Sequence, residues 1–348
     1  MRFPSLPDEF RLARLTPWTD RSRRLPVVID TDAANEIDDQ FALAWALLAR
    51  DRLDVQALLA APFSFAHRRA ALQAARGWDD ATAAAQPAFA PPGDGMWRSL
   101  GEIRRIGALA GLDDAALDRL ACAGATRYLD AGRPERTAAV DRLIALAEAA
   151  DDDTPLFVLV LGCPTNIAAA LLLAPDLVRR LVVVWTAGFP SHAPQPNRAF
   201  NLEQDLPATR VLLDSGVPLV YLPGFHVGAQ LRLPAAEAER ALPGRGGAGG
   251  LGDALHALYT HNPLWPLTGT TSVHDRPAYS WVIWDLICVA WLLDPAWVPT
   301  DLVRTPGLGD DLRWQPGDAH RPWMREAWAV DRDAVFGDLF TRLDALPR

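Results

Sequence analysis

The amino-acid sequence predicts an α/β fold in which a mostly parallel central sheet carries helices on both faces. Apolar runs of strand length alternate with helical segments along most of the chain, which is typical of α/β proteins. The runs are nearly continuous in apolar residues, and strands of that kind are buried on both faces of a parallel sheet. Ligands bind such sheets beyond the carboxyl ends of the strands. We therefore expect a Rossmann-like fold with its active site at that edge.

Strands are expected at short, mainly apolar runs: 25–30, 53–60, 121–126, 156–161, 181–185, 217–222 and 323–330. The first run is followed directly by acidic residues, so the strand ends there. Residues 156–161 contain no polar side chain, which predicts a central strand.

Helices are expected where apolar residues recur at helical spacing, at residues 37–50, 66–76, 96–109, 134–149, 167–173, 207–215, 282–293 and 332–346. Pro207 suits the first turn of its helix. The Pro/Gly-rich segment 86–95 is expected to be a loop.

The chain is long enough for one large domain. It has 348 residues, 50% of them hydrophobic, and can bury a large core. Neither an internal repeat nor a convincing linker divides it, so we expect residues 1–348 to form a single domain. Residues 1–24 are expected to be an N-terminal arm packed on the outside. Residues 231–277 look least like the sheet and are expected to form a helical flap.

Composition excludes several classes of function. The net charge is −9 and no basic block occurs, so nucleic acid and acidic membranes are poor partners. No apolar run approaches the roughly 20 residues of a membrane span, and no secretory signal opens the chain, so a cytoplasmic protein is expected. The absence of lysine excludes Schiff-base chemistry and a Walker lysine. The three cysteines are expected to be reduced core residues: Cys122, Cys163 and Cys288.

Four carboxylates follow the first strand within one short loop: Asp30, Asp32, Asp38 and Asp39. Their mutual repulsion costs free energy unless a cation or bound protons offset it. Hard oxygen ligands of this kind suit Ca²⁺ or Mg²⁺. The alternative is a solvated acidic start to the helix at 37–50, because aspartate near a helix N-terminus is stabilising.

The acidic loop resembles the signature of the nucleoside hydrolases, the inosine–uridine-preferring family. That signature is an Asp-Thr-Asp triplet and a turn followed by Asp-Asp and an apolar helix, matched here by residues 30–32 and 38–39. The turn contains Asn35-Glu36, which resembles a particular branch of the family. Three later segments match in the same order: residues 162–168 (Gly-Cys-Pro-Thr-Asn-Ile-Ala), Phe200-Asn201 and Trp284-Asp285. The resemblance covers about residues 25–340.

By this resemblance, the protein is a hydrolase that cleaves the N-glycosidic bond of a ribonucleoside, and its cofactor is Ca²⁺. The resemblance implies four metal ligands: the side chains of Asp32, Asp39 and Asp285 and the carbonyl of Leu161. It also makes Asp32 the general base. Asp38 and Asn201 are implied to bind the ribose hydroxyls. Family members form dimers and tetramers, so a homo-oligomer is expected.

Two departures from the family pattern bear on the substrate. Ala199 stands where the family has a glutamate that contacts the sugar, and Glu36 or Asn197 is expected to compensate. Trp284 stands where many members have a histidine. An aromatic residue at this position stacks on the base in the purine-preferring branch, which favours a purine-like leaving group. The alternative is that Trp284 only fills the core.

Two further residues are candidates for the substrate site. Asn166, in the turn after the strand at 156–161, either stabilises that turn or contacts the substrate. His274 is expected to line the cleft, although Asp285 is preferred to Asp275 as the metal ligand because an apolar helix follows it.

A different class of function also fits the sequence. A nucleoside- or sugar-binding protein could keep the metal site and have little turnover, an alternative motivated by Ala199 and the altered turn. A phosphatase of the haloacid dehalogenase type is disfavoured because that class needs a lysine.

Overall fold

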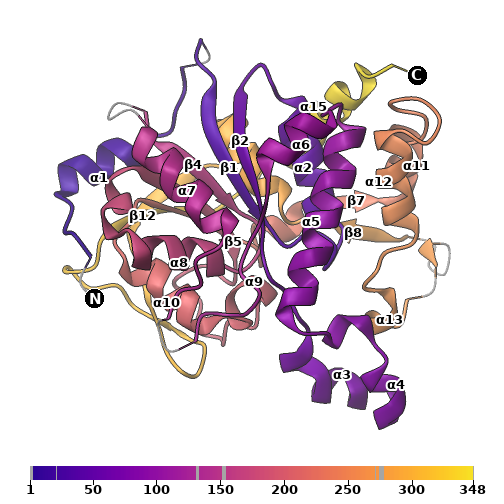
Figure 1. Ribbon diagram of the computed structural model, residues 1–348, viewed down its shortest axis with the longest axis horizontal. Coiled ribbons are helices and arrows are strands. Elements are labelled where there is room, and N and C mark those ends of the chain that lie inside the picture. The colour runs from indigo at the N-terminus through magenta and orange to yellow at the C-terminus, as the bar shows by residue number, and fades with distance from the viewer. Residues whose placement is uncertain are drawn as a thin grey trace.

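An eight-stranded sheet runs through the centre of the computed structural model in the order β3-β2-β1-β4-β5-β6-β12-β9 (Figure 1). The structure describes residues 3–20, 22–130, 133–150, 154–270, 272–273 and 278–347. In sheet order the strands are Ala121–Ala123, Leu53–Ala60, Leu25–Thr31, Leu156–Val160, Leu181–Ala187, Leu219–Pro223, Trp323–Ala327 and Thr300–Arg304. Neighbouring strands are parallel except β12 and β9. The predicted mostly parallel sheet is confirmed.

The α-helices surround this sheet (Figure 1). From the N-terminus they are α1 (Asp8–Leu15), α2 (Asp38–Leu48), α3 (Arg69–Arg76), α4 (Asp80–Ala84), α5 (Pro92–Leu109), α6 (Asp114–Leu120), α7 (Ala138–Ala149) and α8 (Thr165–Leu173). The later ones are α9 (Phe200–Glu203), α10 (Leu206–Asp214), α11 (Ala235–Ala241), α12 (Leu251–Thr260), α13 (Trp265–Thr268), α14 (Leu286–Leu293) and α15 (Arg332–Asp344). Two short pairs of strands lie outside the main sheet: β7 (Arg232–Pro234) with β8 (Ser280–Val282), and β10 (Gly307–Leu308) with β11 (Trp314–Gln315).

Alternate residues of the central strands enter two separate cores. Val27 and Ile29 of β1 pack in the core that contains α2, α5 and α14, whereas Val28 packs in the core that contains α7, α8 and α10. In β4, Leu159 packs in the first of these cores and Val158 in the second. Because side chains alternate along a strand, an unbroken apolar run can bury both faces of the sheet. Helices on both faces are therefore confirmed.

Several boundaries differ from those predicted. The segment 86–95 is not all loop, because α5 begins at Pro92, and proline is tolerated in a first helical turn. The helix predicted from 134 begins at Ala138, where Thr137 caps it by accepting a hydrogen bond from Val140 N at 3.3 Å. The helix predicted from 282 begins at Leu286, because Val282 ends β8 and residues 283–285 form the turn between strand and helix. Strand β9 was not predicted, since as an edge strand it is partly exposed and carries charged residues.

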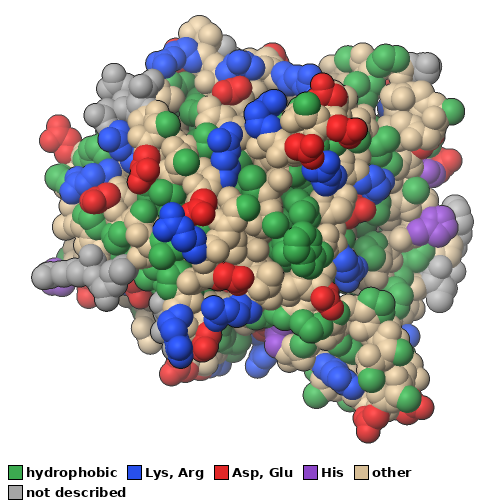
Figure 2. All heavy atoms as spheres, in the orientation of Figure 1, with side chains coloured by type: hydrophobic (Ala, Val, Ile, Leu, Met, Phe, Trp, Pro, Cys, Tyr) green, Lys and Arg blue, Asp and Glu red, His purple; other side chains and the backbone are tan. Residues whose placement is uncertain are grey.

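The predicted N-terminal arm and the predicted flap are both partly helical. Residues 1–24 contain α1, which packs against β12. Of the segment 231–277 predicted as a flap, residues 271 and 274–277 lie outside the described residues. The rest contains α11, α12 and α13, and its action as a flap stays a prediction. Among the described residues, no helix has both the length and the apolar character needed to cross a membrane. On the face shown in Figure 2, acidic and basic side chains are interspersed.

Candidate active site

The acidic loop lies at the carboxyl end of β1, where the chain turns into α2. Asp32 follows the strand, and Asp38 and Asp39 form the first turn of α2, where the partial positive charge of a helix N-terminus favours carboxylates. The backbone N–H of Asn35 donates to the Asp32 carbonyl at 3.1 Å and closes the turn between them. All three aspartates are at most 5% exposed. The solvated helix start considered as an alternative is therefore wrong.

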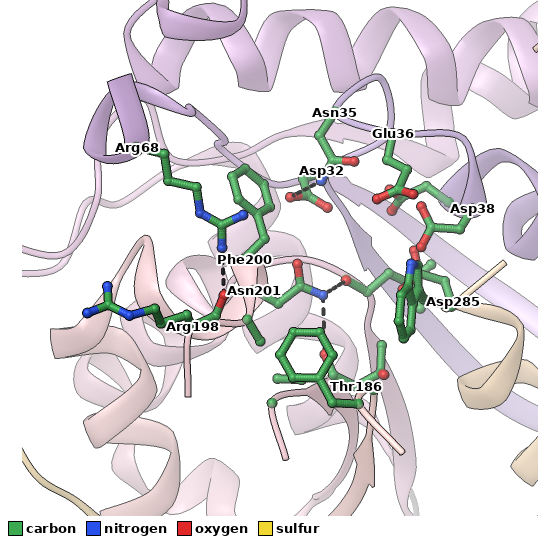
Figure 3. A pocket seen from close by; sticks show the side chains of 18 residues that line it. Asp32, Asn35, Glu36, Asp38, Arg68, Thr186, Arg198, Phe200, Asn201 and Asp285 are labelled. Atoms are coloured by element: carbon green, nitrogen blue, oxygen red, sulfur yellow. Dashed lines mark hydrogen bonds between the residues drawn. The ribbon is translucent and has the colours of Figure 1, made fainter. Parts of the chain in front are cut away.

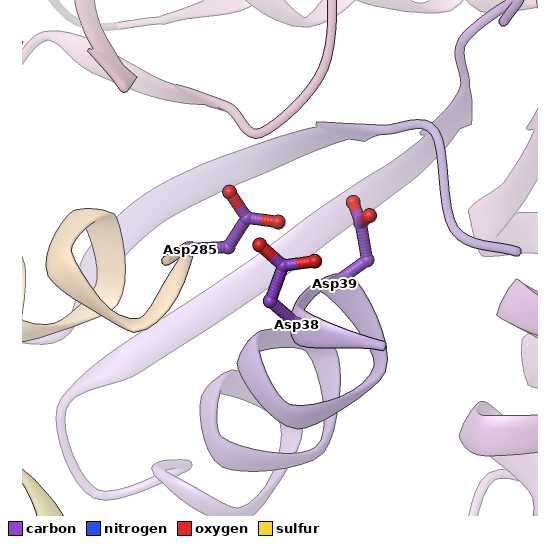
Figure 4. A group of neighbouring side chains, drawn as sticks. All are labelled: Asp38, Asp39 and Asp285. Carbon is purple, nitrogen blue, oxygen red and sulfur yellow. The ribbon is translucent and has the colours of Figure 1, made fainter. Parts of the chain in front are cut away.

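Three buried carboxylates from the starts of two helices, α2 and α14, lie close together. Oxygen atoms of Asp38, Asp39 and Asp285 all lie within 4.8 Å of one another, with Asp285 placed at the start of α14 (Figure 4). Burial raises the pKa of each well above its usual range, and the neighbouring carboxylates raise it further. Two unit charges about 4 Å apart repel by about 4 kcal/mol at an effective dielectric constant of about 20. The group therefore needs protons or a cation.

The donor chemistry of this group fits a hard cation. Asp39 Oδ2 and Asp32 Oδ1 are buried, and neither has a hydrogen-bond partner among the residues described. Buried oxygen atoms without partners are costly unless a ligand satisfies them. Carboxylate oxygens are the ligands that Ca²⁺ and Mg²⁺ prefer. Of the carboxylates predicted as metal ligands, Asp39 and Asp285 belong to this group together with Asp38, and Asp32 does not. All four carboxylates and Leu161 line one cavity.

Asp32 is held by neighbours that orient its carboxylate. Asn35 Nδ2 donates to Asp32 Oδ2 at 2.7 Å, and Gln204 Nε2 lies 3.5 Å from the same oxygen. Gln204 in turn accepts a hydrogen bond from the Tyr128 hydroxyl at 2.7 Å. Burial raises the pKa of Asp32 to about 6, so its carboxyl is mostly ionised at neutral pH. A Cβ atom at Gly162 would lie 2.7 Å from Asp32 Cγ, which explains the glycine.

Asn166 joins the ends of neighbouring strands and does not line the cavity. Its Nδ2 donates to Asp30 Oδ1 at 2.7 Å and to the Ala60 carbonyl at 3.1 Å, and its Oδ1 accepts from Ala125 N at 2.9 Å. Burial raises the pKa of Asp30 to about 8, so this carboxyl is mostly protonated at neutral pH. The placement supports the turn-stabilising interpretation of Asn166.

The two asparagines near residue 200 have different surroundings. Asn201 lines the cavity, and its Nδ2 donates to the carbonyls of Leu161 and Thr186. Asn197 is fully buried outside the cavity lining, where it accepts from Phe189 N at 2.7 Å and donates to the Leu312 carbonyl at 3.2 Å. The structure thus gives Asn197 a role in holding two loops together and does not bring it to the substrate position.

The cavity has a volume of about 200 Å³ and three aromatic residues in its wall: Phe200, Phe225 and Trp284. Phe225 and Trp284 meet edge to face, with ring centroids 5.9 Å apart. Glu36 also lines the cavity and accepts a hydrogen bond from Trp281 Nε1 at 2.6 Å. His274 lies outside the described residues.

Two arginines line the cavity opposite the aspartates: Arg68 and Arg198 (Figure 3). Arg68 ends the short turn after β2, and Arg198 precedes α9. Sequence reasoning missed both, and it also missed Gln204, because no motif marks these positions.

Comparison with known proteins identifies the family to which the chain belongs. A model of the inosine-uridine preferring nucleoside hydrolases matches residues 27–336. The chain belongs to this nucleoside hydrolase family. As a member, the protein is a nucleoside N-ribohydrolase, an enzyme that hydrolyses the N-glycosidic bond of ribonucleosides.

Individual relatives of this nucleoside hydrolase are distant. It is 29% identical over 266 residues to the non-specific ribonucleoside hydrolase RihC of Klebsiella pneumoniae subsp. pneumoniae, an alignment that covers 74% of this chain and 79% of the relative. RihC of Escherichia coli strain SMS-3-5 is 28% identical, with 75% and 79% covered.

Solved structures share the fold of this nucleoside hydrolase. The plant nucleoside hydrolase PpNRh1 superposes with a TM-score of 0.66 at 18% identity, covering 93% of this chain and 100% of that one. The inosine-guanosine nucleoside hydrolase gives 0.63 at 17% identity, with 93% and 100% covered. The effector protein XOO4466 gives 0.57 at 17% identity, with 96% and 95% covered.

Proposed function

We propose that this enzyme is a Ca²⁺-dependent N-ribohydrolase that prefers purine ribonucleosides. The proposal rests on one observation above all: buried carboxylates and an aromatic wall share a single cavity. The side chains of Asp32, Asp39 and Asp285 and the carbonyl of Leu161 would hold the ion, with Asp38 beside them. A bound Ca²⁺ would supply positive charge that neutralises these carboxylates and polarises nearby oxygen atoms.

Residues that line the cavity would carry out the hydrolysis itself. A water molecule adds to C1′ of the ribose while the bond from C1′ to the base breaks and the departing base takes up a proton, through a transition state that resembles an oxocarbenium ion. Asp32, ionised at neutral pH, accepts the proton of that water. Asp38 accepts hydrogen bonds from the ribose hydroxyls, and Asn201 and Glu36 contact the sugar. Because the aspartates are buried, bulk water does not weaken these contacts.

A turnover assay tests the proposed function against a binding role. Inosine, guanosine, adenosine, uridine and cytidine are incubated with enzyme and Ca²⁺, and released base is measured by chromatography. We expect multiple turnovers on a purine nucleoside. Binding of all five without release of base would favour the nucleoside-binding protein instead. The dimer or tetramer and the cytoplasmic location expected from the sequence stay predictions, and light scattering tests the first.

Trp284→Ala should reduce kcat/KM about tenfold on inosine and less on uridine. Stacking between aromatic rings contributes about 0.5–1.5 kcal/mol beyond area burial, and a purine offers more overlap than a pyrimidine. Initial rates on both substrates give the measurement, and Trp328→Ala is the control because Trp328 is 61% exposed and lies outside the cavity lining. Equal losses on both substrates, or a wild-type preference for uridine, would contradict the stacking role.

Ca²⁺ should bind more tightly at about pH 8 than at about pH 5.5, because protons compete with the ion for the carboxylates. Burial raises the pKa of Asp38, Asp39 and Asp285, so these groups stay protonated to a higher pH than usual. The ion-free fold should become less stable over the same rise in pH, since it binds protons that the unfolded chain has already released. Calorimetry and thermal denaturation in chelator measure the two effects. An affinity independent of pH would refute this account.

A further inference from the structure

The cavity has ends of opposite charge. Asp32, Asp38 and Asp285 occupy one side, Arg68 and Arg198 lie on the other, and Asn201 lies between them (Figure 3). A neutral nucleoside has hydroxyl groups for the acidic end and a ring for the aromatic wall. It has no group that matches the charge of two guanidinium groups.

Arg68 is fixed in place at its end of the cavity. Its Nε donates to Glu203 Oε1, its Nη2 donates to the Arg198 carbonyl at 2.7 Å, and its guanidinium lies 5.4 Å from the centre of the Phe200 ring. A guanidinium has five N–H donors, so these two hydrogen bonds leave others unused. The Arg68 side chain is 31% exposed and lines the cavity, so a ligand can reach the remaining donors.

Positive charge exceeds negative charge around Arg68. Glu203 is shared between Arg68 and His67, whose Nε2 lies 3.1 Å from Glu203 Oε1. Arg198 is exposed and forms no ion pair with any residue that the structure describes. Its guanidinium points away from the aspartates (Figure 3). Rotation about its side-chain bonds can bring it to an anion bound at Arg68.

Among the residues that the structure describes, no carboxylate lines the cavity between the two arginines, and Glu203 contacts Arg68 from outside the lining. Ala199, which lines the cavity at 7% exposure, follows Arg198 directly. A glutamate at this position would place a negative charge beside Arg198 and offer an acceptor to a neutral hydroxyl. The alanine adds no charge, so the two guanidinium groups outweigh the single carboxylate of Glu203 at this end.

We propose that the substrate carries a phosphate on C5′, so that the enzyme hydrolyses a ribonucleoside 5′-monophosphate to free base and ribose 5-phosphate. This inference rests on the function proposed above. With the 2′ and 3′ hydroxyls at the acidic end, the C5′ group points away from the aspartates, toward Arg68. Arginine binds phosphate oxygens through paired N–H donors. Only the bond from C1′ to the base breaks: water supplies the oxygen at C1′, the base takes up a proton, and the phosphate ester stays intact.

Kinetics on inosine and inosine 5′-monophosphate test the proposal. We expect wild-type kcat/KM to be roughly tenfold to hundredfold higher for the monophosphate, as charge-assisted hydrogen bonds allow. This ratio should fall toward one in Arg68→Ala and in Arg198→Ala, and KM for the monophosphate alone should rise with ionic strength. Arg69→Ala is the matched control, because Arg69 lies next to Arg68 but outside the cavity, 6.0 Å from the Phe89 ring centre.

The outcomes separate this inference from the proposed function. A wild-type enzyme that hydrolyses inosine as well as the monophosphate, or a ratio that neither arginine variant changes, would overturn the phosphate site and leave the proposed function intact. Hydrolysis of neither substrate would count against the function itself. In that case, calorimetric binding of ribose 5-phosphate and of ribose still tests the phosphate site. The site is supported if ribose 5-phosphate binds more tightly than ribose and Arg198→Ala removes this difference. It is refuted if the two bind equally.

Discussion

Removal of divalent cations should abolish nucleoside hydrolysis, and added Ca²⁺ should restore it. Three carboxylates with oxygens within 4.8 Å of one another cannot all stay ionised without a cation between them. Protonation relieves the repulsion, but it also removes the acceptors that the ribose hydroxyls need. Lewis-acid assistance contributes several kcal/mol, so the loss of rate should exceed about a thousandfold.

Dialysis against a chelator, followed by titration with Ca²⁺ while released base is measured, gives this result directly. Asp285→Asn should weaken Ca²⁺ binding in calorimetry, and Asp176→Asn, an exposed aspartate outside the cavity, should not. If Mg²⁺ but not Ca²⁺ restores activity, the ion is Mg²⁺ and not Ca²⁺. A metal-free preparation, verified by elemental analysis, that retains full activity would remove the metal from the mechanism.

Asp32→Asn should lower kcat by about 10²- to 10⁴-fold, the usual contribution of a general base. The substitution preserves the shape of the side chain and removes both its basicity and its charge. Asn35 Nδ2 lies 2.7 Å from Asp32 Oδ2, so the new amide can present its oxygen to Asn35 and keep its position. The ion-free variant should unfold at an unchanged or higher temperature, because one buried charge is gone.

Asp38→Asn is the informative comparison. Asp38 is assigned to the ribose hydroxyls, so its substitution should raise KM as well as lower kcat, since an amide offers a donor where a carboxylate accepts. Calcium affinity is a second readout. Asp32 is a proposed ligand of the ion and Asp38 lies beside it, so Asp32→Asn should weaken Ca²⁺ binding more than Asp38→Asn. If the Asp32 variant hydrolyses the best substrate at the wild-type rate, another group accepts the proton.

The order of strands and helices was predictable because it depends on local sequence. A run such as 156–161 has apolar side chains at every position, and that pattern alone identifies a strand buried on both faces. Edge strand β9 was not predicted, because its residues are partly exposed and do not form such an apolar pattern. The acidic loop was also recognisable, because Asp32, Asp38 and Asp39 are close in the sequence.

Only the tertiary structure decided which side chains meet. Arg68 and Arg198 follow β2 and β5, which have β1 and β4 between them in the sheet, so their meeting depends on how the loops cross the strand ends. Asn197 and Asn201 are neighbours in the sequence, yet only Asn201 lines the cavity, because contacts with Phe189 and Leu312 bury Asn197. The direction of a loop side chain is set by packing against residues far along the chain, and this information is absent from any local pattern.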